Sequence, residues 1–447
     1  MNLAAVVLAA GQGTRMRSRL PKVLHKLAGH PMVEYPLNAA QAVTGGAPVL
    51  VVGVGAEAVQ AALGGRARYV LQADQLGTAH AVAQARAALE GQCEAVLVTY
   101  ADMPLLREAT LRALTEAQAA NPGPFTLLSV HSAGLRDFGR VVRDAEGRVA
   151  AVVEAIQATP EQYALSEVNV GAYCFEADWL WSALPRLPLS PKGEYYLTDL
   201  VGLAVAEGGR VGSVTTADES EAIGINTRVQ LAAAEAALRQ RINARWMLAG
   251  VTLLDPATTY IDPDAELGAD TTLLPNTHIE GRSVIGAGCI IGPNTIVRAT
   301  AIADGCRVEA SVLEGAVLGE DVRVGPFAHL RQGARLERGV HMGNFGEVKN
   351  ATLGPGVKMG HFSYIGDADI GEDANIGAGT ITCNFDGVKK NHTTVGAHAF
   401  IGSDTLLVAP VTVGDNARTG AGSVVTKNVP PDTLAVGLPA RVIRKLK

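Results

Sequence analysis

The stretch LGADTTLLPNTHIEGRSVIGAGCIIGPNTIV, residues 267–297, sets the fold of the second half of the chain. An aliphatic residue recurs in it at every sixth position, at Leu267, Leu273, Ile279, Ile285, Ile291 and Val297. A period of six matches neither the 3.6 of an α-helix nor the alternation of an ordinary strand. It is the hexapeptide signature of a parallel β-helix, in which each hexad forms one flat wall and a turn. Because one coil cannot bury its own apolar edge, the coils must stack.

The same spacing returns in later groups of residues: Leu318, Val324, Leu330, Leu336, Met342 and Val348; Leu353, Met359 and Ile365; Val395, Ile401, Leu407 and Val413. Glycine directly follows several of the aliphatic residues and suits the corners, because it adopts backbone angles that other residues resist. Chance spacing in a globular domain is the alternative, and the constant phase over many hexads argues against it. At 18 residues per coil, the hexads predict roughly nine coils between Leu267 and Val425.

Two interruptions of the period stand out. The register slips between Val297 and Leu318, which predicts a short loop or a tightened corner. It breaks more fully after Ile376, where the polar segment TITCNFDG, residues 380–387, precedes Val395. A polar, glycine-containing excursion from a rigid scaffold is where function is expected.

Composition limits the function classes. The chain has 447 residues and a formal net charge of −6, which argues against a nucleic-acid binder or a basic membrane patch. Five cysteines without metal-binding spacing indicate a reducing compartment with thiols buried as small hydrophobic groups. No apolar run is long enough to span a membrane, so we expect a cytoplasmic protein without membrane insertion.

The N-terminal half has the pattern of an α/β domain. Apolar strands are predicted at residues 3–8, 49–54 and 95–99, and helical patterns lie between them, which favours a mostly parallel sheet. Ligands bind such sheets at the carboxyl ends of the strands, where Gly11 and Asp102 fall. Gly11 and Gly13 would let backbone N–H groups approach phosphate oxygens, and Arg15 and Lys22 would neutralise their charge. A G-x-G alone could equally be a tight turn.

The longer string LAAGQGTRMRSRLPKVLHKLAG, residues 8–29, is more specific. It resembles the signature of sugar-1-phosphate nucleotidyltransferases, most closely the bifunctional N-acetylglucosamine-1-phosphate uridyltransferase/glucosamine-1-phosphate acetyltransferase family. The resemblance covers nearly the whole chain. It implies a uridyltransferase domain at residues 1–226, a helical linker at 227–250 and a left-handed β-helix acetyltransferase domain at 251–447. It also implies a homotrimer formed through the β-helix, with acetyl sites made from neighbouring subunits.

In the N-terminal domain, the resemblance implies contacts to UTP and the sugar phosphate at Leu8, Ala9, Ala10, Gly11, Arg15, Lys22, Gln72, Gly77, Thr78, Tyr100, Ala101, Asp102, Gly139, Glu154, Asn169 and Asn226. Gln72 and the Gly77-Thr78 pair would contact uracil, and Asp102 and Asn226 would hold Mg²⁺, which prefers oxygen ligands. From the residues alone, Thr78 could instead cap a helix, and so could Asp102. The sugar phosphate would attack the α-phosphorus of UTP, and pyrophosphate would leave.

In the C-terminal domain, the string GHFSYIGD, residues 360–367, matches the family segment with the catalytic histidine. His361 would accept a proton from the amine of glucosamine 1-phosphate as the amine attacks acetyl-CoA, since a histidine titrates near pH 6.5. Glu347 would orient His361. The other implied contacts are Arg331 and Lys349 to phosphate, Tyr364 and Asn375 to the sugar, and Ala378, Asn384, Phe385, Ser403 and Ala421 to acetyl-CoA. A solvated wall residue is the alternative for His361.

The chain departs from the family pattern at several positions: Gln12 replaces lysine, Ala101 glycine, Gln332 proline, Phe385 tyrosine and Leu438 arginine, and Glu154 is followed by an apolar pair. We expect the added methyl of Ala101 to lie beside the ribose and uridylyl transfer to be retained. We expect acetyl transfer with weakened or rearranged CoA binding, in which Arg441 or Arg444 could substitute for the arginine.

A single helix is predicted at residues 228–249, capped by Thr227 and ended by Gly250. It could be a rigid strut between the domains or an ordinary amphipathic helix packed on one of them. The leading interpretation is a two-activity enzyme that makes UDP-N-acetylglucosamine. The alternatives are another sugar-1-phosphate nucleotidyltransferase with a different or idle β-helix, and a non-catalytic regulatory subunit of the same fold.

Overall fold

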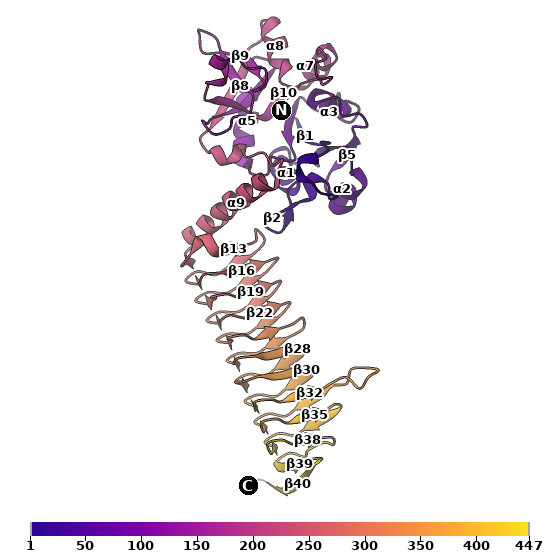
Figure 1. Ribbon diagram of the computed structural model, residues 1–447, viewed down its shortest axis with the longest axis vertical. Helices are drawn as coiled ribbons and strands as arrows, with labels where there is room; N and C mark the ends of the chain where they lie inside the picture. Colours follow the sequence, from indigo (N-terminus) through magenta and orange to yellow (C-terminus); the bar gives the residue numbers. More distant parts are fainter. Residues whose placement is uncertain (1, 446–447) are drawn as a thin grey trace. The chain divides into compact units, whose positions relative to one another are not determined.

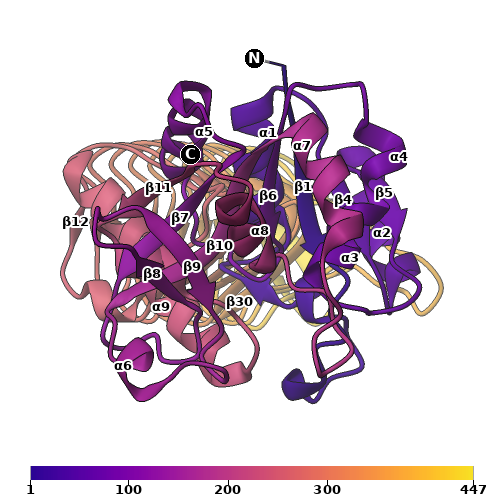
Figure 2. The ribbon, with the colours of Figure 1, turned by 90° about the horizontal axis from the view of Figure 1, so that it is seen from above.

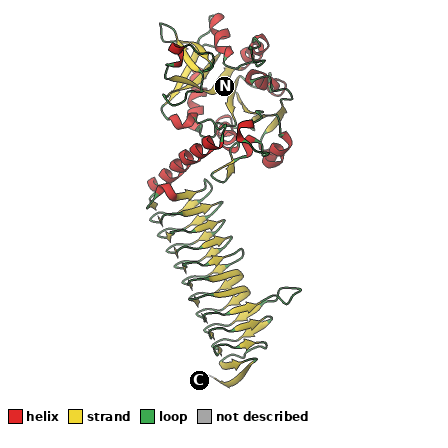
Figure 3. Cartoon of the chain, in the orientation of Figure 1, coloured by secondary structure: helices red, strands yellow, loops and turns green. Residues whose placement is uncertain are grey.

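The computed structural model describes residues 2–445, which divide into two compact units between residues 238 and 239. The first unit mixes helices and strands, and the second is a stack of short strands joined by turns (Figures 1 and 3). This is the predicted fold class, an α/β nucleotidyltransferase domain followed by a left-handed parallel β-helix. No helix among the described residues has the length and apolar character needed to cross a membrane.

The main sheet of the first unit has the strand order β11-β7-β10-β6-β1-β4-β5. Its strands are β1 (Leu3–Ala9), β4 (Val49–Val52), β5 (Arg68–Leu71), β6 (Ala95–Tyr100), β7 (Phe125–His131), β10 (Glu167–Glu176) and β11 (Val211–Thr216). Strand β10 is antiparallel to both neighbours and the remaining pairs along this path are parallel, as predicted. The strand predicted at 49–54 ends earlier because the chain turns at Gly53, where a Cβ would lie 2.5 Å from the Ala10 oxygen.

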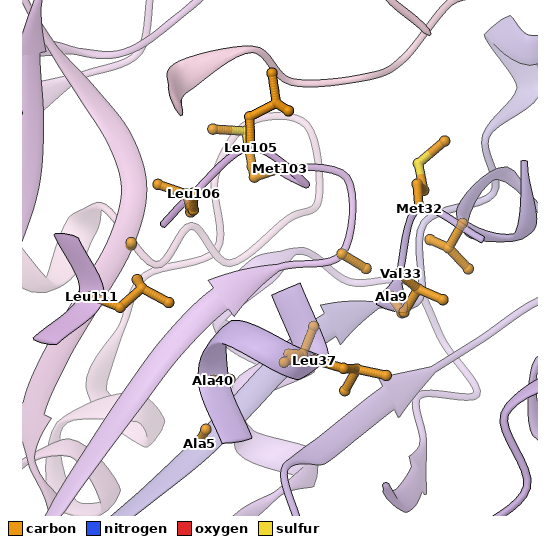
Figure 4. Packing of buried hydrophobic residues seen from close by; sticks show 14 of the residues in the cluster. Ala5, Ala9, Met32, Val33, Leu37, Ala40, Met103, Leu105, Leu106 and Leu111 are labelled. Carbon is orange, nitrogen blue, oxygen red and sulfur yellow. The ribbon is translucent and has the colours of Figure 1, made fainter. Parts of the chain in front are cut away.

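Helices cover both faces of this sheet. Alternate residues of β1 point to opposite faces, so that Ala5 and Val7 belong to one hydrophobic core and Val6 and Leu8 to the other. The first core is covered by α1 (Glu34–Thr44), α2 (Ala56–Leu63) and α5 (Glu108–Ala120). The second is covered by α3 (Thr78–Gln84), α7 (Ala177–Ala183) and α8 (Asp199–Ala206). Figure 2 shows the sheet between these layers, and Figure 4 shows Leu37 of α1 in the first core.

The second unit buries the hexad residues in the interior of a prism. Leu273, Ile279 and Val297 are completely buried, and each is preceded two positions earlier by a small residue that is also buried. Cys289 occupies one of these small-residue positions. All five cysteines are free, but the prediction that they are buried is wrong for Cys93 and Cys383, which are partly exposed. One wall is a 12-stranded sheet, and the other strands form a 17-stranded sheet that continues around a corner.

Both interruptions of the hexad period are structural. Val297 pairs with Leu313, only 16 positions later, and Ala299 and Ala310 adopt positive φ at the shortened turns. The predicted tightened corner is therefore confirmed. Ile370 pairs with Val395, 25 positions later, because residues 384–392 form a loop that projects beside β32 (Ile381–Cys383) in Figure 1. This is the predicted excursion.

Two further elements precede and follow the coils in the chain. Helix α9 (Arg228–Leu248) begins with a capping box, in which Thr227 Oγ1 accepts from Gln230 N–H at 3.2 Å and Gln230 Oε1 accepts from Thr227 N–H at 3.0 Å. The predicted cap is confirmed. At the other end, β39 (Thr433–Gly437) pairs with an antiparallel strand, β40 (Ala440–Lys445).

Candidate active sites

Segments far apart in sequence meet at the carboxyl edge of the first sheet. The parallel register of β1 and β6 places Leu8 beside Tyr100, and Ala101 N–H donates to Leu8 O at 2.9 Å. Ile225 N–H donates to Asp102 O at 2.9 Å, which brings the next residue, Asn226, to the same edge. The glycine loop after β1, Asp102 and Asn226 are thereby brought together.

Lys22 lies at the centre of this junction. Its Nζ is 2.5 Å from Asp102 Oδ2 and 3.1 Å from Asn226 Oδ1, and its side chain is 10% exposed. The ammonium group shows that the two oxygens converge on a point that accepts a cation. Because the described residues contain no cluster of three metal-ligating His, Cys, Asp or Glu side chains, a hard cation here would need further oxygens from phosphate or water. Mg²⁺ is typically bound in this way.

Two cavities of about 470 and 450 Å³ lie on either side of Asp102. We name the larger the nucleotide cavity and the smaller the sugar cavity, after the ligands that the family resemblance implies for their lining residues. They share four lining residues: Thr78, Tyr100, Asp102 and Tyr196. Ligands in the two cavities would therefore meet at the carboxylate of Asp102.

Fifteen of the sixteen residues expected to bind substrate in this domain line one or both cavities. The nucleotide cavity includes Leu8, Ala9, Ala10, Gly11, Lys22, Gln72, Gly77, Thr78, Tyr100 and Asp102. The sugar cavity adds Arg15, Gly139, Glu154, Asn169 and Asn226. Ala101 is the exception, because its side chain is completely buried in the first hydrophobic core. The added methyl thus lies in the core and lines neither cavity.

The sugar cavity contains a partly buried carboxyl group. Glu154 Oε1 accepts from Thr198 Oγ1 at 2.9 Å, and burial raises the pKa of Glu154. Asn169 Nδ2 donates to Tyr173 OH at 2.6 Å, which fixes the orientation of the amide. Thr198 and Tyr173 were not among the predicted residues, since no local motif links them to Glu154 or Asn169.

The start of α3 forms one wall of the nucleotide cavity. Gly77 adopts φ +101°, and a Cβ there would lie 2.5 Å from the backbone oxygen of Tyr195. Thr78 Oγ1 accepts from Leu197 N–H at 2.9 Å and makes no capping bond to its own helix. The alternative role of Thr78 as a helix cap is therefore wrong. Asp102 is not a helix cap either, since its carboxylate is paired with Lys22.

In the second unit, a cationic cluster lies on consecutive coils. Leu330 pairs with Val348, so the next residues, Arg331 and Lys349, are neighbours. The excursion adds Lys390, whose proximity lowers the pKa of Lys349. Lys390 was not predicted, because the projecting loop returns to the wall only in the folded chain. Three cations on one wall favour an anionic ligand.

Beside this cluster, Asn384 is buried in a polar network. Its Nδ2 is 2.5 Å from Asp367 Oδ2 and 3.4 Å from Tyr364 OH. Burial opposes ionisation of Asp367, but hydrogen bonds from Asn350 and Asn384 hold its pKa below the ordinary value. An adjacent cavity of about 560 Å³ is lined by Phe345, Glu347, Phe362, Ser363, Tyr364, Gly379, Ile381, Asp404 and Leu406. We call it the wall cavity.

The remaining predicted acetyltransferase residues are spread over several walls. Glu347 Oε1 accepts from Arg331 Nη1 at 2.8 Å. His361 is exposed, and it forms no hydrogen bond or ion pair with residues 2–445. Asn375 lies on β31 (Asn375–Ile376) in the 12-stranded sheet, whereas Tyr364 lies in the other. Glu347, which was expected to orient His361, is thus paired with Arg331 instead, and the two residues expected to contact the sugar lie in different sheets.

Three of the five residues expected to contact acetyl-CoA follow one corner of the prism, and the other two, Asn384 and Phe385, lie in the excursion. Asp404 N–H donates to Ala378 O at 2.6 Å, and Gly422 N–H donates to Ser403 O at 2.8 Å. Ala378, Ser403 and Ala421 thus stack on successive coils, and His361 lies one coil before Ala378 because Gly379 N–H donates to Phe362 O at 2.7 Å.

Comparisons with known proteins agree on both units. Residues 5–167 match the MobA-like NTP transferase domain, and residues 264–299 and 392–427 match the bacterial transferase hexapeptide (six repeats). The chain is 49% identical to the bifunctional protein GlmU of Trichlorobacter lovleyi over 97% of this chain and 95% of that protein. It is 48% identical to the bifunctional protein GlmU of Heliobacterium modesticaldum (97% and 94%) and 46% identical to that of Pelobacter propionicus (99% and 97%). The chain belongs to the GlmU family.

Membership of the GlmU family confirms the predicted bifunctional enzyme, a nucleotidyltransferase and acetyltransferase in UDP-N-acetylglucosamine synthesis. Nucleotidyltransferases of this kind use a divalent metal. The amide of Gln12 donates to Gln75 Oε1 at 2.9 Å, and both residues line the nucleotide cavity. Phe385 and Leu438 are exposed, so neither substitution disturbs the interior of the prism.

Proposed function

We propose that the first unit transfers a uridylyl group from UTP to N-acetylglucosamine 1-phosphate, with Mg²⁺ held by Asp102 and Asn226. The second unit acetylates glucosamine 1-phosphate from acetyl-CoA, with His361 as the base. The observation that carries the first assignment is the Lys22–Asp102–Asn226 junction between two substrate-sized cavities. Free thiols are consistent with a cytoplasmic setting.

Uridylyl transfer requires positioning and charge neutralisation. UTP in the nucleotide cavity and the sugar phosphate in the sugar cavity place the attacking oxygen and the α-phosphorus at their shared wall. Lys22 and Arg15 neutralise phosphate charge, and Lys22 exchanges its carboxylate partner for phosphate when the nucleotide binds. A bound Mg²⁺ supplies further charge cancellation on the phosphates.

Gly11 leaves the glycine loop after β1 open to a phosphate group. A Cβ at Gly11 would meet no atom within 4 Å, so there is free space at the loop for a phosphate group. Gly13 has a different role, since it adopts φ +63° and a Cβ there would lie 2.6 Å from Lys22 Cβ. The loop therefore presents backbone N–H groups and holds the stem of Lys22 close.

Acetyl transfer uses the cationic cluster and the corner of the prism. Arg331 and Lys349 bind the phosphate of glucosamine 1-phosphate, and Lys390 joins them. His361 takes a proton as the amine forms a bond to the thioester carbonyl carbon, and the CoA thiolate leaves when the C–S bond breaks. Ala378, Ser403 and Ala421 contact acetyl-CoA along the corner, and Asn384 and Phe385 contact it from the excursion.

A homotrimer completes the acetyltransferase site, because residues of neighbouring chains come together there. Phe327, Phe345 and Phe362 form an exposed column on successive coils, with 60, 59 and 56% of each residue exposed. The rings of Phe327 and Phe345 stack at 5.4 Å. This aromatic column borders the wall cavity, so a second copy that covers it would bring its own residues to the site. Three copies around a three-fold axis complete three such sites.

The test is a reaction with glucosamine 1-phosphate, acetyl-CoA, UTP and Mg²⁺, with the product identified by mass. Asp102→Asn should abolish pyrophosphate release and leave thiol release from acetyl-CoA intact. His361→Ala should have the opposite effect. Asp178→Asn, at an exposed carboxylate of α7, is the matched control and should change neither rate. Unchanged pyrophosphate release in Asp102→Asn would overturn the metal assignment.

A further inference from the structure

Gln72, at the end of β5, holds its side-chain amide in a fixed network. Only 3% of the residue is exposed. Its Nε2 lies 3.2 Å from Gly77 O and 3.0 Å from His80 Nδ1. Gln72 also lines the nucleotide cavity. The network therefore connects the wall of that cavity to α3, on which His80 lies.

The orientation of the amide follows from the chemistry of Gly77 O. A backbone carbonyl can only accept a hydrogen bond, so the group of Gln72 that faces it must be the NH₂. The second hydrogen of the same NH₂ points to His80 Nδ1. With both hydrogens engaged, Oε1 is the atom of the amide that remains for a ligand. Gln72 thus offers the nucleotide an acceptor and no donor.

This orientation also determines the tautomer of His80. Nδ1 must be the unprotonated nitrogen, because it faces a donor, and the ring proton is then on Nε2. Nε2 lies 3.1 Å from the amide nitrogen of Gln84, which also donates to His80 O at 3.1 Å. Gln84 is partly exposed, so its amide can leave this contact and turn its oxygen toward the ring proton. The buried contact to Gln72 has less freedom, so it decides the tautomer.

We infer that His80 is a positioning residue for base selection, which holds Gln72 as a hydrogen-bond acceptor for the N3–H of uracil. This inference rests on the proposed uridylyl transfer. Uracil carries a hydrogen on N3, whereas cytosine presents a lone pair there. An acceptor at Oε1 binds the first and repels the second. Without His80, only the 3.2 Å contact to Gly77 O holds the amide, which can then turn and present NH₂ to cytosine.

The test compares kcat/KM for UTP and CTP in the full chain. His80→Leu should lower the UTP preference about tenfold, the factor that one hydrogen bond of about 1.4 kcal/mol represents. The change should come mainly from KM, with kcat at saturating UTP retained. His80→Asn, which keeps an acceptor near the position of Nδ1, should restore most of the preference. His131→Leu, at an exposed histidine at the end of β7, is the matched control and should keep the wild-type ratio.

The outcomes distinguish the proposed contact between Gln72 and uracil from the proposed role of His80. A wild-type enzyme that uses CTP as well as UTP would overturn the proposed base contact itself, and so would an unchanged preference in Gln72→Leu. If Gln72→Leu loses the preference but His80→Leu keeps it, only the role of His80 is wrong. Thermal unfolding of each variant checks that the domain is folded. If His80→Leu does not fold, His80→Ala, which also removes the acceptor, decides the question.

Discussion

Single residues carry the charges that the two sites need, and partial burial of some of these charges lowers the stability of the fold. Glu154 is an example, since burial raises its pKa. The pKa of Glu154 is therefore higher in the folded chain than in the unfolded chain. The side chain contributes stability at acidic pH, and this contribution is lost as the pH rises through the folded-state pKa. At neutral pH, an ionised Glu154 therefore opposes folding.

Glu154→Gln should accordingly make the chain more stable than the wild type at pH 7 and leave little difference below the unfolded pKa of a glutamate, about 4.3. The amide oxygen can still accept from Thr198. Thermal unfolding at pH 4 and pH 7 measures this. Glu57→Gln, at an exposed glutamate of α2, serves as the control. An equal difference at both pH values would show that the buried charge is not the cause.

Arg331→Ala should raise KM for glucosamine 1-phosphate roughly 10- to 100-fold, because the charge-assisted hydrogen bond to the phosphate is lost. Pyrophosphate release by the first unit should be unchanged. Arg335→Ala removes a more exposed arginine from the same 17-stranded sheet and should have no effect on KM. Equal effects of the two variants would contradict a specific phosphate contact.

The sequence predicted those site residues that lie within contiguous motifs. The strings around Gly11, Gln72 and Asp102 were sufficient, because strand ends in a parallel sheet meet at one edge. His80, Thr198 and Lys390 could not be predicted. His80 contacts Gln72, 8 positions away, Thr198 contacts Glu154, 44 positions away, and Lys390 lies near Asp367, 23 positions away. These contacts depend on how the segments pack in the folded chain.

At the scale of elements, the excursion at residues 384–392 is separable from the prism. Phe385 and Lys390 form a bridge at its base, and Asn391 N–H donates to Asn384 O at 2.7 Å, so the ends of the loop are close together. The coil before it and the coil after it keep their interior aliphatic residues, Ile370 and Val395.

Deletion of residues 385–391 should return this coil to the 18-residue spacing seen between Val395 and Val413. The shortened chain should fold and keep uridylyl transfer, because no interior side chain is lost. Acetyl transfer should disappear with Lys390 and Phe385. Circular dichroism and the two activity assays test this, and retained acetyl transfer would show that the loop is not part of the site.

The coils were predictable from the hexads alone, but their exact lengths were not. A corner can close with one or two residues fewer when a residue such as Ala299 accepts positive φ. Counting by six therefore loses phase between Val297 and Leu318, although the interior column stays continuous in space.

At the scale of the whole molecule, the aromatic column of Phe327, Phe345 and Phe362 allows the proposed assembly of chains to be tested. Phe327 and Phe345 both adopt positive φ, which asparagine tolerates better than phenylalanine. The double variant Phe327→Asn/Phe345→Asn should therefore fold, yet sediment as a smaller species and lose acetyl transfer. Uridylyl transfer should persist, since its cavities lie within the first unit. A variant that remains trimeric would exclude this column from the interface.

The separation of the two activities permits a second test. Each cavity assigned to a substrate is lined by residues of one unit. We expect a mixture of the Asp102→Asn and His361→Ala chains to form UDP-N-acetylglucosamine from glucosamine 1-phosphate, because the acetylated sugar can diffuse between molecules. Mass spectrometry detects the product, and the single variants alone are the controls.

The antiparallel strand β40 has a consequence for solubility. A β-helix ends in a coil whose backbone N–H and C=O groups would pair with any exposed strand, including the end of another molecule. β40 occupies the free edge of β39 with a strand of reversed direction, which ends the parallel stacking. A chain lacking Ala440–Lys445 would keep the uridyltransferase site in the first unit and expose that edge, so it should polymerise end to end into filaments.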